Sequence, residues 1–387
     1  MASRTRAKHE ARRLLDTAAA AARNLRVLPS IPYPDQRVTL EDVRQRPAAF
    51  RSEVCDIFAA GKPPSGVANS VTAFPAGAFR PLAEQFVSVP GVVLRSRGGC
   101  LMGPDGAVVT PSGEVISDTL WTPELFEAGF PKRRCIRPPR RVAGSHASLV
   151  APWSSNWGHW LINTLPRLRT LELAGLSRIP IIVPRRLPPA KRASLEMLGI
   201  SEDRRTDYPR EGLKPDELIW PSSGTHAYYP TSEALNWLRD RILGALGIES
   251  HPHRRLYISR SSSTTQRLPR GYPRRAVTNE DEVVDLLAGF GFETVRPEAL
   301  TFADQVRLFA NARVVVAPHG SGSANCLFSQ STTLVEFFEP RFTDPSSYAL
   351  AAACGHEYWY LMGATADRGD IAVPVDALRE TLRQLGI

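Results

Sequence analysis

The sequence predicts an α/β protein with parallel sheets, and three observations carry that prediction. From residue 154 onward, short apolar runs alternate with segments of helical periodicity, which is the pattern of strands joined by helices. The runs are continuous in apolar and β-branched residues, as expected of strands that are buried on both faces. The clearest run, Val314 to Ala317, leads through Pro318 into a loop of Gly and Ser, after which we expect a helix to start near the apolar run at 326–328. Loops at the carboxyl ends of parallel strands are where α/β proteins bind their ligands.

Length and composition admit two domains of ordinary size. The chain has 387 residues, of which 43% are hydrophobic and 22% charged, as in soluble globular proteins. No apolar run approaches the roughly 18–20 residues that span a bilayer, and the basic N-terminus lacks the apolar core of a secretory signal. Five cysteines without a Cys-x-x-Cys pair suit a reducing compartment. We therefore expect a cytoplasmic protein.

The net charge favours anionic partners. The chain carries 48 Lys and Arg against 39 Asp and Glu, a formal charge of +9. Nucleotide diphosphates, acidic glycans, anionic membrane surfaces and nucleic acid all suit that balance. No nucleic-acid-binding motif accompanies the charge, so nucleic acid is the least favoured of these partners.

The first 120 residues predict an extension followed by a β-meander. Residues 1–26 have the composition of a basic, Ala-rich helix, which is either a solvated terminal helix or one that lies on an anionic membrane surface. Residues 27–80 are rich in Pro and lack periodicity, so we assign 1–80 to an extension. Short β runs separated by Gly and Pro turns between Phe86 and Leu120 predict the β-meander.

The remaining chain predicts two α/β blocks. In the first, at 81–235, we expect a helix at 157–174, a strand at 179–183, a helix at 188–198 and a strand at 217–220. A linking helix at 235–246 follows, and the second block occupies 236–375. There we expect strands at 255–259, 292–296, 313–317 and 333–338, with helices from 278 to 288 and at 301–311. A terminal helix within 376–387 could cross back to the first block.

Three polar residues share one face of the helix predicted at 157–174. His159, Asn163 and Arg167 lie at positions i, i+4 and i+8. Such a polar stripe is costly on an apolar helix unless it lines a cleft or finds partners. An imidazole there could act as a general base near neutral pH, or it could be a buried histidine that bonds the backbone.

Two segments of the second block suit an anion. Arg260 follows a predicted strand, where a guanidinium would point into the ligand crevice. The loop after Pro318 offers small residues and backbone N–H groups to a diphosphate; its candidate binding residues are His319, Gly320, Ser321, Gly322, Ser323 and Asn325. Asn325 replaces the third glycine of a dinucleotide fingerprint, so we exclude an NAD site.

The carboxylates point to ribose rather than to a metal. Glu336 lies within the apolar strand at 333–338, where it needs a partner, either a ribose hydroxyl or an arginine. The chain contains no Asp-x-Asp, so a carboxylate-held divalent cation is not indicated. The histidines are too dispersed to form a zinc site.

An ordered set of short motifs extends across about residues 145–360. The segments are Asn156-Trp-Gly-His159-Trp160, Leu165-Pro-Arg167, Ile258-Ser-Arg260, Asn279-Glu280, Phe302-x-x-Gln305, Phe309-x-x-Ala312, Ala317-Pro-His319-Gly320-x-Gly322-x-x-Asn325, Glu336-Phe-Phe338 and Gly355-His356-x-Tyr358. Each segment is weak alone, whereas their order is specific. In this order they resemble glycosyltransferase family 61, the group of bacterial capsular-polysaccharide-type glycosyltransferases.

The resemblance implies a GT-B architecture, in which two Rossmann-like domains face each other across a cleft. It also implies inverting, metal-independent transfer without a cofactor, from a nucleotide sugar, commonly a UDP-sugar, to an oligosaccharide or polysaccharide acceptor. Arg260, His319 and the backbone of 320–325 would hold the diphosphate, and Glu336 the ribose. His159 would be the base, oriented by Asn163 and Arg167. A catalytically silent nucleotide- or glycan-binding module is the alternative.

Overall fold

The computed structural model of the chain describes residues 37–38, 50–55, 91–103, 106–111, 115–116, 119, 138–151, 154–223, 230–261, 274–340, 344 and 346–387. The basic helix predicted at 1–26, its membrane contact and most of the extension to residue 80 lie outside these residues. Among the residues that are described, no helix combines the length and the apolar character needed to cross a membrane.

The N-terminal sheet combines the predicted meander with parallel strands. Its order is β1-β6-β5-β4-β10-β7-β8-β9, with β3 paired to both β2 and β10. β3 to β5 are antiparallel to their neighbours, whereas β7, β8 and β9 run parallel, and β10 runs parallel to β7. The strands are β1 (Arg37–Val38), β2 (Phe50–Cys55), β3 (Gly91–Arg97), β4 (Cys100–Met102), β5 (Ala107–Val109), β6 (Val115–Ile116), β7 (Arg140–Ser148), β8 (Ile181–Val183), β9 (Arg205–Asp207) and β10 (Leu213–Pro221).

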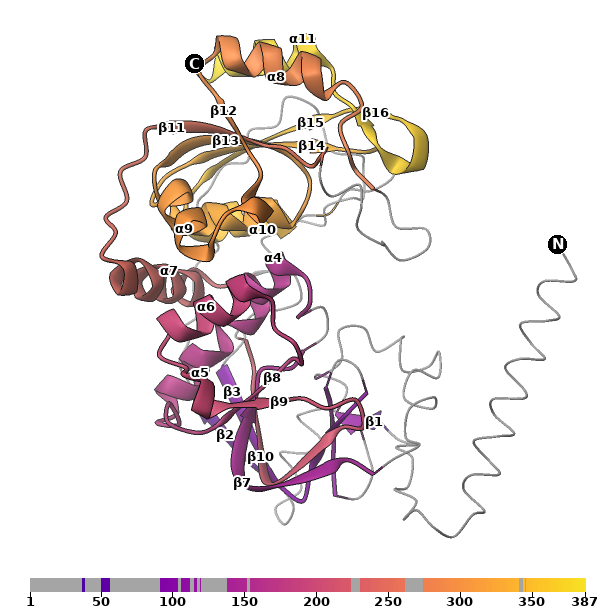
Figure 1. Cartoon of the computed structure of the whole chain (residues 1–387), viewed down its shortest axis with the longest axis vertical. Helices are drawn as coiled ribbons and strands as arrows, with labels where there is room; N and C mark the ends of the chain where they lie inside the picture. The colour runs from indigo at the N-terminus through magenta and orange to yellow at the C-terminus, as the bar shows by residue number, and fades with distance from the viewer. Residues whose placement is uncertain are drawn as a thin grey trace, which may run out of the picture.

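The C-terminal sheet is parallel throughout, in the order β12-β11-β13-β14-β15. Its strands are β11 (Arg254–Ile258), β12 (Glu293–Val295), β13 (Ala312–Pro318), β14 (Thr333–Phe338) and β15 (Glu357–Met362). Both faces are covered (Figure 1). Val314 and Val316 of β13 pack into the cluster with α8 (Glu280–Gly289) and α11 (Val375–Gln384), and the alternate residues face α9 (Phe302–Ala310) and α10 (Ser346–Cys354). Burial on two faces explains the continuous apolar runs.

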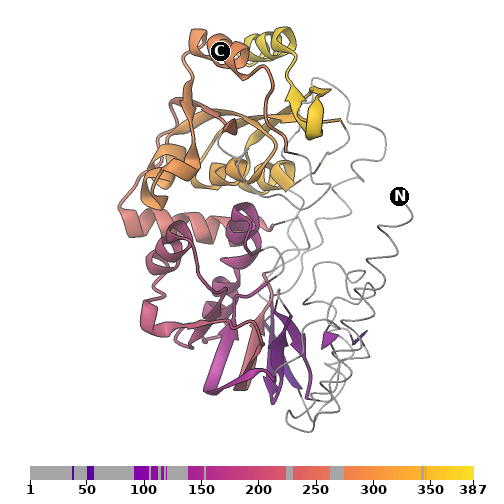
Figure 2. The ribbon, with the colours of Figure 1, turned by 45° about the vertical axis from the view of Figure 1, so that its right-hand side comes forward.

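Helices fill the space between the two sheets. They are α4 (Trp157–His159), the π-helix η4 (Trp160–Thr164), α5 (Arg167–Leu173), α6 (Pro189–Met197) and α7 (Ser232–Leu246). Figures 1 and 2 show them between the N-terminal sheet and the face of the C-terminal sheet that carries α9 and α10. One hydrophobic cluster runs through this layer and includes Ile181 of β8, Trp160 of η4 and Val315 of β13. The layer therefore fixes α4 against the C-terminal sheet.

The α/β prediction is confirmed, and its details differ in four places. The helix predicted at 157–174 is divided into α4, η4 and α5. The helix expected after the Gly-Ser loop is the 3₁₀ helix η8 (Ser321–Phe328). The strands β7, β9 and β15, the helix α10 and the short strands after β15 were not predicted. The terminal helix α11 packs beside α8 on the C-terminal sheet and does not cross back.

The remaining short elements are η5 (Glu202–Arg204), η7 (Pro297–Ala299), η9 (Asp367–Gly369), β16 (Ala364–Thr365) and β17 (Ile371–Ala372). β16 and β17 form a two-stranded antiparallel sheet after β15. Val277 adds a parallel bridge to Ile371 of β17, so the segment before α8 is fixed against β17.

Candidate active site

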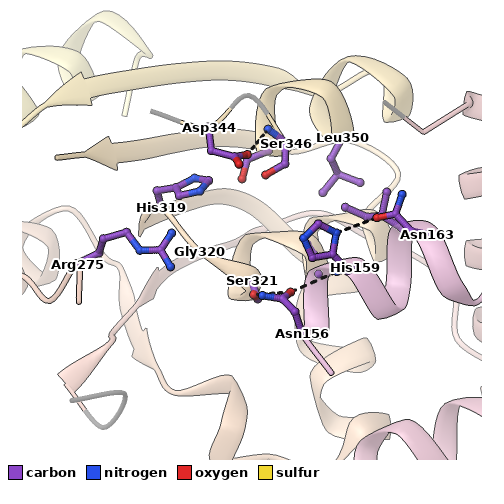
Figure 3. A pocket seen from close by; sticks show the side chains of 14 residues that line it. Asn156, His159, Asn163, Arg275, His319, Gly320, Ser321, Asp344, Ser346 and Leu350 are labelled. Atoms are coloured by element: carbon purple, nitrogen blue, oxygen red, sulfur yellow. Dashed lines mark hydrogen bonds between the residues drawn. The ribbon is translucent and has the colours of Figure 1, made fainter. Parts of the chain in front are cut away.

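One pocket brings together residues that are far apart in the sequence (Figure 3). Its N-terminal wall comes from α4 and η4 and includes Asn156, His159 and Asn163. Its C-terminal wall comes from the loop after β13 and from the start of α10. Both walls carry polar side chains, so the pocket suits a polar ligand.

A π-turn makes the contact between His159 and Asn163. Asn156 caps α4, because its Oδ1 accepts from the backbone N–H of His159 at 3.3 Å. The N–H of Leu165 then donates to the carbonyl of Trp160, five residues back, at 2.9 Å. In this turn, Nδ1 of His159 lies 2.9 Å from Oδ1 of Asn163. The fully buried Trp160 anchors the turn in the core.

The environment of His159 favours the neutral imidazole. Burial lowers its pKa from the ordinary value, and the hydrogen bond to Asn163 and the negative charge of Asp344 oppose that shift in part. An amide oxygen can only accept, so Nδ1 of His159 is the donor and Nε2 carries the lone pair. Figure 3 shows the imidazole at the pocket, on the opposite side from Arg275. The group has the protonation state of a general base.

Arg167 lies behind the pocket wall rather than on it. Its Nε donates to the carbonyl of Asn163 at 3.3 Å, and its guanidinium stacks over Trp220 at 5.0 Å. Burial lowers its pKa to about 10. Arg167 therefore contacts the backbone of the predicted stripe, and it is not among the residues that line the pocket.

His319 is held by contacts on two sides. Its Nδ1 lies 3.0 Å from Oε1 of Glu336, and its ring stacks on Phe338 with the centroids 5.0 Å apart. The backbone N–H of His319 donates to the carbonyl of Phe337 at 2.9 Å. These contacts fix the direction of the ring, which lines the pocket.

Glu336 lies beneath the pocket and is fully buried. Its Oε1 also accepts from Ser347 at 2.8 Å and from Ser323 at 3.4 Å, and its Oε2 accepts from Tyr358 at 2.7 Å. Protein donors therefore occupy both oxygens. The arrangement does not support the ribose contact expected from the sequence, because Glu336 does not line the pocket and is separated from it by His319 and Ser347.

A glycine at position 320 makes room for Arg260. A Cβ added to Gly320 would lie 1.9 Å from Nη1 of Arg260, and that nitrogen donates to the carbonyl of His319 at 3.5 Å. Burial lowers the pKa of Arg260 to about 10, and the positive charge of Arg275 contributes to the shift. Arg260 thus lies directly behind the loop at the pocket and keeps its positive charge at neutral pH.

The loop of 320–325 packs onto α4. Ser321 donates to Oδ1 of Asn156 at 2.9 Å, and Nε1 of Trp157 donates to Oδ1 of Asn325 at 3.0 Å. Gly320 and Ser321 line the pocket. Gly322, Ser323 and Asn325 support the loop from behind; a Cβ on Gly322 would lie 3.2 Å from Ile258.

The sequence interpretation missed Arg275, Asp344, Ser346 and Ser347, all of which line the pocket. The backbone N–H of Ser346 donates to Oδ1 of Asp344 at 2.8 Å, at the start of α10. Asp-Pro-Ser-Ser before an Ala-rich segment is a helix-start signal that could have indicated α10. Arg275 lies in a basic stretch of the sequence, and such a stretch is most often solvated surface, so it gives no local signal of a site.

Metal independence stays a prediction. Within the part of the chain that the structure describes, no three His, Cys, Asp or Glu side chains gather as metal ligands would.

Comparison with known families matches a region that contributes to both walls of the pocket. The model of the family described as Glycosyltransferase 61 matches residues 157–335, which include His159, Arg260 and His319. A comparison with the curated proteins gave no match. Residues 157–335 of this chain are therefore similar to glycosyltransferase family 61, the family that the ordered motifs of the sequence indicated.

Proposed function

We propose that this protein is an inverting glycosyltransferase that moves a sugar from a UDP-sugar to a hydroxyl of a glycan acceptor in surface polysaccharide biosynthesis. The family supplies glycosyl transfer; the donor, the stereochemistry and the pathway are our proposal. One observation carries it: the pocket sets His159, on the N-terminal side, opposite His319 and Gly320, on the C-terminal side. A base and a candidate anion site thus border the same space.

The C-terminal wall is the proposed donor site. Arg260 supplies a positive guanidinium, His319 supplies a polar imidazole, and the loop of 320–325 supplies backbone polar groups next to them. The start of α10 adds the positive end of a helix dipole at the same wall. A diphosphate carries concentrated negative charge, which such a wall would stabilise as the charge grows in the transition state.

The N-terminal wall is the proposed catalytic side. Nε2 of His159 takes the proton of the acceptor hydroxyl as its oxygen bonds to the anomeric carbon. The bond from that carbon to the diphosphate breaks on the opposite face, so the configuration inverts. Asn163 holds the tautomer of His159 through Nδ1, and Arg167 holds the backbone of Asn163. Glu336 acts through His319.

The architecture proposed for this reaction is GT-B, with 81–235 as the acceptor-side domain and 236–375 as the donor-side domain. Two sheets with a helical layer between them support that division. A cytoplasmic location and contact of 1–26 with an anionic membrane complete the proposal; the formal charge of +9 supports the membrane contact.

Thermal unfolding with a panel of nucleotides and nucleotide sugars, with and without EDTA, tests the donor. A ligand at about 100 times its Kd adds about 2.7 kcal/mol, which raises Tm by several degrees. We expect UDP and one UDP-sugar to stabilise the protein, with no effect of EDTA. A Tm that no nucleotide changes would overturn the donor assignment, and a shift lost with EDTA would overturn metal independence.

Turnover tests the chemistry. We expect the stabilising UDP-sugar to be consumed in the presence of a glycan acceptor, with inversion at the anomeric carbon of the product. His159→Ala should keep the Tm shift and lose at least about a hundredfold in rate. A parent protein that binds the nucleotide sugar and never transfers it, with any acceptor, would favour the silent binding module.

A further inference from the structure

Arg275 enters the pocket with an unusual backbone conformation. Its φ is 59°, in the left-handed region that residues other than glycine rarely adopt. Its side chain is buried and lines the pocket with His319 and Gly320. In Figure 3 the guanidinium points into the pocket toward these residues, from the side opposite His159. A strained residue with a buried charge needs surrounding structure to hold it.

Asp370 supplies that structure. The carboxylate is almost fully buried, and both of its oxygens accept from Nε of Arg274 at 2.9 Å. Oδ1 also accepts from the backbone N–H of Ala276 at 3.0 Å. One carboxylate therefore fixes the residues immediately before and after Arg275. The carbonyl of Gly369 accepts from the N–H of Arg275 itself at 3.0 Å.

A second arginine shows that the conformation alone does not make a site. Arg186 has φ 58°, but its side chain is exposed and does not line the pocket. Arg275 differs in its burial, in its carboxylate clamp and in its place on the pocket wall. These three features together indicate a side chain that is held for a ligand.

The charges around Arg275 indicate the kind of ligand. Arg260 lies behind the same loop, and the positive charge of Arg275 helps to lower its pKa. Two guanidinium groups that repel each other, one lining the pocket and one behind its loop, are both stabilised by an anion bound in the pocket. A diphosphate, with oxygens on two phosphorus atoms, fits that requirement better than a single carboxylate.

We propose that Arg275 binds the diphosphate of the donor, and that Asp370 is a positioning residue that acts by fixing the backbone on both sides of Arg275. The inference rests on the proposed function, and it adds a binding residue and its support to that site. The guanidinium supplies fork-shaped donors to phosphate oxygens.

Calorimetric titration with inorganic pyrophosphate and with UDP tests the role of Arg275. Arg275→Gly removes the guanidinium and relieves the positive φ, so binding and folding should change in different directions. We expect both ligands to bind about tenfold more weakly or worse, with Tm unchanged or higher. Arg186→Gly is the matched control. Its Tm should change in the same direction as that of Arg275→Gly, and its affinity for both ligands should be unchanged.

The role of Asp370 is tested by a double-mutant cycle. Asp370→Asn should weaken pyrophosphate binding in the parent and have no further effect in the Arg275→Gly background. Equal losses in the two backgrounds would overturn the positioning role. If Asp370→Asn does not fold, Arg274→Gln, which removes one side of the clamp, takes its place in the cycle.

The outcomes separate the two proposals. A parent that binds pyrophosphate and UDP, with Arg275→Gly binding them equally well, overturns the inference and leaves the donor site intact. A parent that binds neither ligand overturns the donor site and the inference with it.

Discussion

Nε1 of Trp157 donates to Oδ1 of Asn325 at 3.0 Å, although 168 positions separate the two residues in the chain. Asn325 in turn donates from Nδ2 to Oε1 of Gln305 at 3.2 Å. Asn325 is fully buried. The first residue of α4 and the loop at the donor wall are therefore joined by a partly buried polar contact, so the two walls of the pocket keep their spacing.

Trp157→Phe should lower stability by removing that contact. The variant leaves the buried Oδ1 of Asn325 without its donor, at a cost of about 1–3 kcal/mol. Trp237→Phe is the control, because Nε1 of Trp237 donates to the exposed Glu172 at 3.2 Å, where water can replace it. Urea unfolding of both variants measures the difference. Equal losses would mean that the buried bond contributes nothing beyond ring packing.

Asn163→Asp should move the acid limb of kcat/KM to higher pH. His159 must be neutral to act as the base, and burial lowers its pKa, so the limb of the parent lies below the ordinary value of about 6.5. A carboxylate next to Nδ1 favours the imidazolium and raises that pKa by about 1–3 units.

Asp344→Asn is the opposite test of the same base. It removes a charge that raises the pKa of His159, and the amide oxygen of asparagine can still accept from the backbone N–H of Ser346, so the limb should move to lower pH. Rate profiles from pH 4.5 to 8 (roughly the range in which histidines titrate) decide the matter. A limb that stays in place in both variants would mean that His159 is not the titrating base.

Gly320→Ala should weaken donor binding without unfolding the protein. The added Cβ meets the end of the flexible Arg260 side chain, and φ at 320 is extended, so the guanidinium moves and the backbone does not. We expect affinity for UDP to fall about tenfold, and Arg260→Ala to add little in that background.

Gly244→Ala provides the control for that substitution. Gly244 lies within α7, and a Cβ there would meet no atom within 4 Å. The change should raise stability by about 0.5–1 kcal/mol and leave UDP affinity unchanged. If Gly320→Ala binds UDP like the parent, Arg260 has no part in donor binding.

Glu336→Gln should lower both stability and UDP affinity. The amide has one acceptor oxygen, so it cannot accept from His319, Ser347 and Tyr358 together. The lost buried bond costs about 1–3 kcal/mol, and His319 loses its fixed direction. Calorimetry and UDP titration measure the two effects.

Glu357→Gln, on the neighbouring strand β15, is the matched control. Glu357 accepts from Thr333 and from Trp359 where it is partly exposed, so water can compensate and the loss should stay under about 1 kcal/mol. If Glu336→Gln binds UDP with the affinity of the parent, the fixed direction of His319 does not contribute to donor binding.

How well the sequence predicted the fold depended on burial. Thr333–Phe338 was predicted with the bounds of β14, because a run buried on two faces leaves a continuous apolar signal. β7 gave no such signal, since its first half, from Arg140, is largely exposed and contains no continuous apolar run. α10 is rich in alanine on all sides, so it lacks the apolar stripe by which a helix is recognised.

The site was predicted where local spacing determines it. Asn163 lies four positions after His159, and the two side chains meet. Arg167 was expected on the same face, but the π-turn and Pro166 intervene, and its guanidinium packs on Trp220 instead. Arg275 and Asp344 reach the pocket only through tertiary structure, which no local pattern in the chain encodes.

Because of the π-turn at Trp160–Thr164, the geometry of the pocket depends on the number of residues in this helical segment as well as on their identity. Deleting one residue from this turn would let an ordinary α-helix form, and His159 would rotate by about 100° relative to α5. The scaffold could survive such a deletion, but the imidazole would leave its wall. In related chains, an alignment gap between the positions of Trp160 and Pro166 would therefore indicate that the active site is lost, even where every polar residue is retained.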